Sequence, residues 1–252
     1  MTALPSTAYD STTDDIDPGV RDLLDRKATR ITDHVRYQPL QTPDVERRLR
    51  QFFATTAPSA EVHGVSRMGG GASKEQFVFS LRTGTADEKY VLRMDPAQTA
   101  AETEREFQVL NAYSRHLPAP HAEWLDDEGQ HFGQPAAIMK FVPGVTKPTT
   151  KSDGPNVTGL GTSFPRELRA ELGPQFIDLL ARTHAVDWCS EDLPSFARPT
   201  PGTVQTALWQ VNWMARVWRD DHIEASPIAA VTERWLRQNL PVCESPTMVH
   251  GD

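Results

Sequence analysis

The sequence is poor in cysteine, in long apolar runs and in positive charge, and each shortage excludes a class of protein. Its 252 residues include two cysteines, Cys189 and Cys243, which can form at most one disulfide and no four-cysteine zinc site. Two reduced thiols favour a cytoplasmic protein. No apolar stretch approaches the roughly 18 residues that a membrane span needs. Residues 1–17 lack both the basic residues and the apolar segment of a secretory signal.

Acidic side chains outnumber basic ones by 34 to 26, which gives a net charge of −8. This balance argues against a nucleic-acid partner, which needs a basic surface. Half of the net charge belongs to the N-terminal segment, which has no basic residue and holds Asp10, Asp14, Asp15 and Asp17. We expect residues 1–17 to be a disordered acidic tail. The whole chain is 38% hydrophobic, enough for a core, and its length of 252 residues allows one large domain or two lobes.

The hydrophobic period predicts two helices, then a sheet, then more helices. Helices are expected over 18–35 and from Thr42-Pro43 onward, with Thr42 as N-cap, so that 18–60 forms an N-terminal helical part. Strand-like alternation follows, interrupted by helical spacing at 98–116. The expected strands are 61–68, 75–82, 89–94, 121–126 and 135–142. Residues 61–142 thus predict an α+β N-lobe, a five-stranded antiparallel sheet with one inserted helix.

The second half of the sequence is predicted to be helical after a long exposed loop at 143–165. Helices are expected at 166–186, 203–220 and 226–239, within a C-lobe spanning 166–252. The last of them would turn four residues toward a core: Ile228, Val231, Trp235 and Leu236. Three tryptophans of the middle helix fit either core packing or an apolar acceptor pocket: Trp209, Trp213 and Trp218.

A run of glycines, Gly69, Gly70 and Gly71, stands between two expected strands and is followed by Ser73. Such a run lets backbone N–H groups approach a phosphate. The dinucleotide fingerprint fails at Lys74, and the P-loop pattern lacks its Lys-Ser/Thr pair. A strand–loop–strand remains, which fits a kinase phosphate flap or an ordinary hairpin turn.

Two charged residues could complete a phosphate site. Alternation in the third strand puts Val91 and Arg93 on one face, where Val91 could touch a flat base and Arg93 could reach phosphate oxygens. On the helix at 98–116, Glu106 is the acid turned most nearly toward the sheet and could pair with Arg93. Taken alone, Arg93 fits a surface arginine and Glu106 a solvated charge, for which Glu102 and Glu104 are the natural examples.

The last residues of the sequence are Val249-His250-Gly251-Asp252, in which a short apolar run is followed by a predicted His-Gly-Asp turn. An aspartate placed there could accept a proton from a substrate hydroxyl or orient it. The tripeptide alone is also a common turn.

These elements, in this order, resemble the aminoglycoside phosphotransferase-like family of the protein-kinase-like superfold, and most closely the kinase-like domains fused to acyl-CoA dehydrogenases, where arginine is common on the third strand. The resemblance covers about Val62 to Asp252. Six motifs carry it: Gly-Gly-Gly-Ala-Ser at 69–73, Tyr-Val-Leu-Arg at 90–93, Glu-Arg-Glu-Phe-Gln-Val-Leu at 104–110, Ile-Met-Lys-Phe-Val-Pro-Gly at 138–144, Leu-Leu-Ala-Arg-Thr-His-Ala-Val-Asp at 179–187 and Val-His-Gly-Asp at 249–252.

The resemblance implies a two-lobe small-molecule kinase that uses ATP or GTP with Mg²⁺ and a hydroxylated acceptor. The glycines and Ser73 would cover the phosphates, Arg93 and Glu106 would form the phosphate-orienting pair, and Asp252 would be the catalytic aspartate. His184 would be a packed structural histidine. The hinge that meets adenine would be Ile138, Met139, Lys140, Phe141 and Val142.

One departure from the family concerns the metal. The family places an Asn and an Asp beyond His-Gly-Asp as Mg²⁺ ligands, and neither lies within these 252 residues, so we assign no metal ligand and expect this chain alone to be inactive. We also expect apolar surface to be exposed over 166–239. The alternatives are a non-catalytic nucleotide-binding relative and a truncated inactive product.

Overall fold

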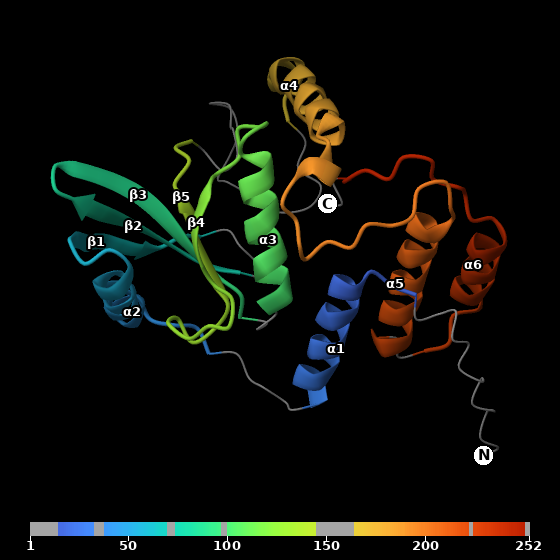
Figure 1. Cartoon of the computed structure of the whole chain (residues 1–252), viewed down its shortest axis with the longest axis horizontal. Helices are drawn as coiled ribbons and strands as arrows, with labels where there is room; N and C mark the ends of the chain where they lie inside the picture. The colour runs from blue at the N-terminus through green and yellow to red at the C-terminus, as the bar shows by residue number, and fades with distance from the viewer. Residues whose placement is uncertain are drawn as a thin grey trace. The chain divides into compact units, whose positions relative to one another are not determined.

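The structure is a computed structural model (Figure 1) that describes residues 15–32, 38–69, 74–96, 100–144, 164–221 and 224–249. The chain divides into two compact units. One combines residues 1–35 with 194–247, and the other combines 36–193 with 248–252.

The larger unit is built on a five-stranded antiparallel sheet with the strand order β1-β2-β3-β5-β4. Its strands are β1 (Ala60–Arg67), β2 (Glu75–Thr83), β3 (Ala86–Met94), β4 (Ala122–Asp126) and β5 (Ala136–Lys140). The helix α3 (Ala100–Tyr113) is inserted between β3 and β4. The predicted α+β class, the five strands and the inserted helix are therefore confirmed.

The strand β3 begins three residues earlier than the sequence suggested. Gly84, at φ +60°, and Thr85 form a two-residue turn, so the ladder between β2 and β3 already starts with Thr83 opposite Ala86. Two-residue turns with positive φ match the natural twist of paired strands. This tight turn fixes the register of the whole hairpin, which bears on the site below.

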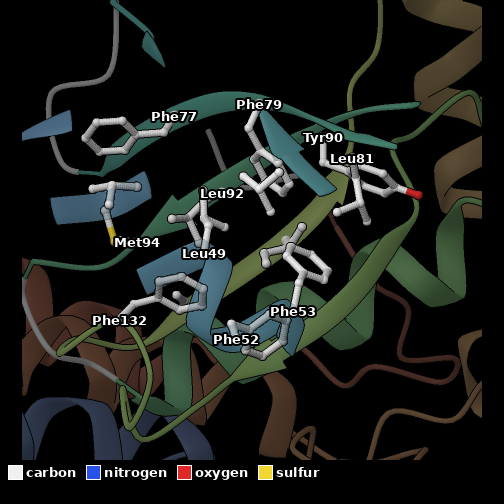
Figure 2. Packing of buried hydrophobic residues seen from close by; sticks show 14 residues of the cluster. Leu49, Phe52, Phe53, Phe77, Phe79, Leu81, Tyr90, Leu92, Met94 and Phe132 are labelled. Carbon is white, nitrogen blue, oxygen red and sulfur yellow. The ribbon is translucent and has the colours of Figure 1, made fainter. Parts of the chain in front are cut away.

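One face of the sheet is covered by α2 (Thr42–Thr56), as Figure 2 shows. The buried side chains of α2 recur at helical spacing, and they meet alternate residues of the strands. The phenyl ring of Phe53 stands edge-on to the indole of Trp124 with centroids 5.0 Å apart. The cluster includes Val45, Leu49, Phe52, Phe53, Phe77, Phe79, Leu81, Tyr90, Leu92 and Met94. It is the core of this unit.

The start of α2 corrects one expectation. The N-cap is Gln41 rather than Thr42, and the carbonyl of Gln41 accepts hydrogen bonds from the N–H groups of Asp44 and Val45 at 3.0 and 3.1 Å. The Gln41 side chain makes no capping bond. The helix still begins at the predicted place, because Pro43 occupies an early position where its missing N–H costs nothing.

The opposite face of the sheet carries a second, smaller cluster. Val91, Ala122, Ala137 and Met139 are buried there, and Phe107 and Leu110 of α3 pack against them. Because neighbouring residues of β3 and β5 alternate between the two clusters, the predicted alternation along 90–94 is confirmed. The face that carries Val91 and Arg93 is therefore the one that meets α3.

The larger unit continues into α4 (Arg166–Ala185) and the short 3₁₀ helix η2 (Trp188–Ser190). None of the described residues of α4 is buried, and His184 is exposed. The expectation that His184 is a packed core histidine is therefore wrong in this structure. The helix forms where predicted, but it lacks a packed face.

An ionic cluster joins the end of α3 to η2. Glu191, 9% exposed, pairs with Arg115 and accepts a hydrogen bond from His116 Nε2 at 2.7 Å. This bond is the main reason that the pKa of Glu191 is lowered, with the Arg115 charge adding to it. Burial and the nearby Glu191 charge raise the pKa of Tyr113.

Because the pKa of Glu191 is lowered by folding, its ionised form stabilises the fold above the unfolded-state value of about 4.3, and this contribution is lost as pH falls through the folded-state pKa. We expect Glu191→Gln to lower Tm by about 2–4 °C at pH 7, with the difference shrinking as pH falls below the unfolded-state value of about 4.3. Thermal unfolding monitored between pH 3.5 and 7 measures this, with Glu167→Gln on exposed α4 as the control. A difference that stays constant with pH would contradict the assignment.

The smaller unit contains α1 (Pro18–Thr32), α5 (Gln205–Asp221) and α6 (Pro227–Gln238). Residues assigned above to the end of the acidic tail pack here: Ile16 is 2% exposed, and Asp15 accepts hydrogen bonds from Trp209 Nε1 at 2.7 Å and Asn212 Nδ2 at 2.8 Å. Trp218 is 46% exposed. The tryptophans of α5 therefore do not form a buried core together.

The expectation for α6 is wrong, because its apolar residues do not face a core. Ile228, Val231 and Trp235 are 77%, 67% and 60% exposed, and Leu236 is 38% exposed. Phe176 and Ile177 of α4 are also exposed. The separate expectation of exposed apolar surface over 166–239 is thereby confirmed. Of the helices that the structure describes, none is both long and apolar enough to cross a bilayer.

Candidate active site

The predicted pair of Arg93 and Glu106 is present in the structure. Arg93 lies near the end of β3, and Glu106 lies in the middle of α3 on the side that packs on the sheet. Arg93 Nε is 2.9 Å from Glu106 Oε1, and the two side chains are 31% and 28% exposed. The cross-strand neighbours of Arg93 are Gln76 of β2 and Ala137 of β5.

The contact between Arg93 and Glu106 is an ion pair without an aligned hydrogen bond at Nε. This nitrogen is buried and has no hydrogen-bond partner among the described residues, although the carboxylate is close. A guanidinium has five N–H donors in a planar fork. Glu106 is its one ion-pair partner in the described part of the chain. The carboxylate fixes the direction of the side chain, and donors remain for an anion.

An apolar floor lies on the same face. Val91 and Met139 are direct cross-strand partners, 8% and 7% exposed, and Met68 packs against them from the end of β1. A small exposed area on two buried apolar residues suits contact with a flat ring. The cation and the apolar floor therefore occupy neighbouring positions on one face of the sheet.

The expected hinge divides into two parts. Ile138, Met139 and Lys140 belong to β5, and only Phe141 and Val142 follow it. The N–H of Lys140 donates to the His121 carbonyl and that of Phe141 to the Lys89 carbonyl, both at 2.9 Å. The Lys140 side chain is 47% exposed and lies 3.8 and 3.6 Å from two carboxylates, those of Glu88 and Glu123. Val142 is 57% exposed.

A second charged cluster on this face was not predicted. Lys74 Nζ lies 2.9 Å from Asp95 Oδ2 and 3.2 Å from Glu102 Oε1. Lys74 and Asp95 are 7% and 1% exposed, whereas Glu102 is 48% exposed. Glu102 is exposed, as expected for a solvated flank charge, but its carboxylate also pairs with Lys74, which was not expected. Glu104 accepts a hydrogen bond from Gln108 Nε2 of its own helix at 3.0 Å.

Several predicted site residues lie outside the described residues, namely Gly70, Gly71, Ser73 and Asp252. Gly69 is described, directly after Met68, whose N–H donates to the Gln76 carbonyl at 2.8 Å. The roles assigned to these residues stay predictions. The described geometry brings together Val91, Arg93, Glu106 and Met139, and adds Lys74 and its two acids.

A five-stranded antiparallel sheet with an inserted helix, whose glutamate pairs with a cation of the third strand, defines the N-lobe of a kinase-like protein. The model of the phosphotransferase enzyme family matches residues 64–252, three quarters of this chain. The chain therefore belongs to the phosphotransferase enzyme family, and the resemblance drawn from its motifs is confirmed.

Two curated relatives are similar over most of this chain. Acyl-CoA dehydrogenase family member 10 of Mus musculus is 29% identical over 177 residues, which cover 66% of this chain and 15% of the relative. Probable acyl-CoA dehydrogenase IBR3 of Arabidopsis thaliana is 29% identical over 199 residues, covering 75% of this chain and 23% of the relative. The chain thus spans less than a quarter of the length of these relatives. No solved structure matches it.

Proposed function

We propose that this chain carries the nucleotide-binding part of a small-molecule kinase, which transfers the γ-phosphoryl group of ATP to a hydroxyl of its substrate. The observation that carries the proposal is the family match over 64–252. The ion pair of Arg93 with Glu106 supports it. Mg²⁺ would accompany the nucleotide, as in other phosphoryl-transfer enzymes.

The described residues fit the triphosphate end of a nucleotide through Arg93. Its buried Nε has no aligned bond in the described part of the chain, and its direction is set by Glu106. Such a guanidinium would hold phosphate oxygens through charge-assisted hydrogen bonds. Bound ATP would supply the transferable phosphoryl group.

The base end of the nucleotide would lie against Val91 and Met139 and meet Val142, the last residue of the hinge. The two apolar side chains would lie against the adenine ring. Lys140 and Phe141 already use their N–H groups within the sheet, and Pro143 has none. A hydrogen bond from the hinge to adenine would therefore come from the N–H of Val142. Asp252 would accept the proton of the substrate hydroxyl or orient that hydroxyl.

The acceptor is proposed as a class. The family implies aminoglycosides, macrolides, choline-like alcohols and hydroxylated acyl thioesters. The names of the two relatives refer to acyl-CoA, which makes a hydroxylated acyl thioester the first acceptor to test.

The proposal is tested by measuring binding and transfer separately. Calorimetry of the chain with Mg-ATP, Mg-GTP and adenosine reports binding, and a coupled assay of ADP release reports transfer by the complete gene product with each acceptor. We expect triphosphates to bind more tightly than adenosine, and ADP release to depend on one acceptor class. Triphosphate binding without transfer would favour a non-catalytic nucleotide-binding relative. Absence of nucleotide binding would overturn the proposal.

A further inference from the structure

Two carboxylates of α3, four residues apart, each contact a cation at or beside the sheet. Glu102 contacts Lys74, and Glu106 contacts Arg93. Residues four apart lie one above the other on a helix, so α3 meets the sheet through two acids one turn apart. The first cation stands just before β2, and the second belongs to β3.

The hairpin register explains why Lys74 is available for this contact. Glu75 is the cross-strand partner of Met94, the last pair of the ladder, so Lys74 and Asp95 lie opposite each other just beyond its end. Asp95 also continues the alternation of Val91 and Arg93 onto the face that meets α3. Since the Asp95 carboxylate is almost fully buried, it needs the Lys74 ammonium beside it.

The start of β2 is held on the other face as well. Glu75 is buried at 5% exposure, and its carboxylate accepts hydrogen bonds from Arg67 Nη1 at 2.6 Å and Gln134 Nε2 at 3.2 Å. The consecutive residues Lys74 and Glu75 are therefore held by contacts on opposite faces of the sheet. Because Lys74 is held in place in this way, its contact with Glu102 can position α3.

We propose that Lys74 is a positioning residue: together with Asp95 it holds the first turn of α3 through Glu102, and so sets the position of Glu106 and the direction of Arg93. Lys74 acts through these neighbours and does not touch the nucleotide. The claim that this arrangement serves phosphate binding rests on the proposed function. The contact by which Lys74 holds α3 does not depend on that function.

The link is tested with Glu102→Gln, which removes one charge at a half-exposed position and leaves the buried pair of Lys74 and Asp95 intact. Glu104→Gln is the matched control, because it makes the same chemical change on the same helix outside the cluster. Hydrogen exchange of the amides of residues 104–109 reports how firmly α3 is held. Calorimetry with Mg-ATP and with adenosine reports the consequence for binding.

We expect Glu102→Gln to accelerate exchange over 104–109 and to weaken ATP binding, each by about two- to fivefold, because a partly exposed ion pair is lost. Adenosine binding should not change, since the base does not contact Arg93, and Glu104→Gln should change neither measurement. Equal exchange in the two variants would overturn the proposal. If Glu102→Gln accelerates exchange but the unsubstituted chain binds no ATP, the positioning role stands and the proposed function fails.

Discussion

Replacing Arg93 with alanine is expected to weaken Mg-ATP binding about 10- to 100-fold, because charge-assisted hydrogen bonds of about 1.5–3 kcal/mol are lost. The loss should concern the triphosphate alone, so adenosine binding should stay within about twofold. Arg93→Lys should recover part of the affinity, since an ammonium keeps the charge but not the planar fork. Calorimetry with the two ligands separates these effects.

The expected coupling between Arg93 and Glu106 makes this test specific. Because Glu106 acts by fixing Arg93, Glu106→Gln should add little to Arg93→Ala when the two are combined, although it weakens binding alone. Arg82→Ala is the control: this arginine lies on the neighbouring strand, 48% exposed and close to Glu61 and Asp87. Equal losses for ATP and adenosine in Arg93→Ala would show a general structural defect and contradict a phosphate-binding role.

The sheet could be predicted from the sequence because its signals are local. Alternation along β2 reflects burial on one face, and a period of two residues is visible in a short window. The same alternation put Val91 and Arg93 on one face, and helical spacing singled out Glu106. These predictions needed no information on how distant segments pair.

The cluster around Lys74 was missed because it depends on register. The turn was placed at 83–85 and the third strand at 89–94, which left the pairing of the two strands undefined. With a two-residue turn at Gly84-Thr85, the register puts Lys74 opposite Asp95. A signal was therefore present in the turn, since a glycine at positive φ in a two-residue loop fixes the pairing on both sides.

For the helices after residue 165, the sequence predicted correctly where they lie along the chain but not how they pack. The burial predicted for Ile228, Val231 and Trp235 is wrong, because all three side chains are exposed. Apolar spacing shows that a helix has an apolar face, and it does not show which segment covers that face. His184 fails for the same reason, because packing depends on neighbours that local sequence does not specify.

Replacing Lys74 with methionine is expected to lower the free energy of unfolding by about 3–5 kcal/mol, the usual cost of breaking a buried ion pair by removing one partner. Methionine keeps most of the side-chain volume, so the loss arises from the Asp95 carboxylate, which is 1% exposed and would lose the cation that lies 2.9 Å from its Oδ2. Urea denaturation followed by circular dichroism measures the change. Lys140→Met, at a 47% exposed lysine of the same sheet, should cost less than about 1 kcal/mol.

The double variant Lys74→Met with Asp95→Asn decides the cause of this loss. Asparagine is close to aspartate in shape and carries no charge, so the variant should regain more than half of the lost stability, as expected when both members of a buried pair are neutralised together. If Lys74→Met does not accumulate as folded protein, recovery of soluble protein in the double variant gives the same answer. A double variant no more stable than Lys74→Met would mean that Lys74 stabilises the fold by packing its alkyl chain. The buried charge of Asp95 would then not be the reason that a lysine follows the glycine run.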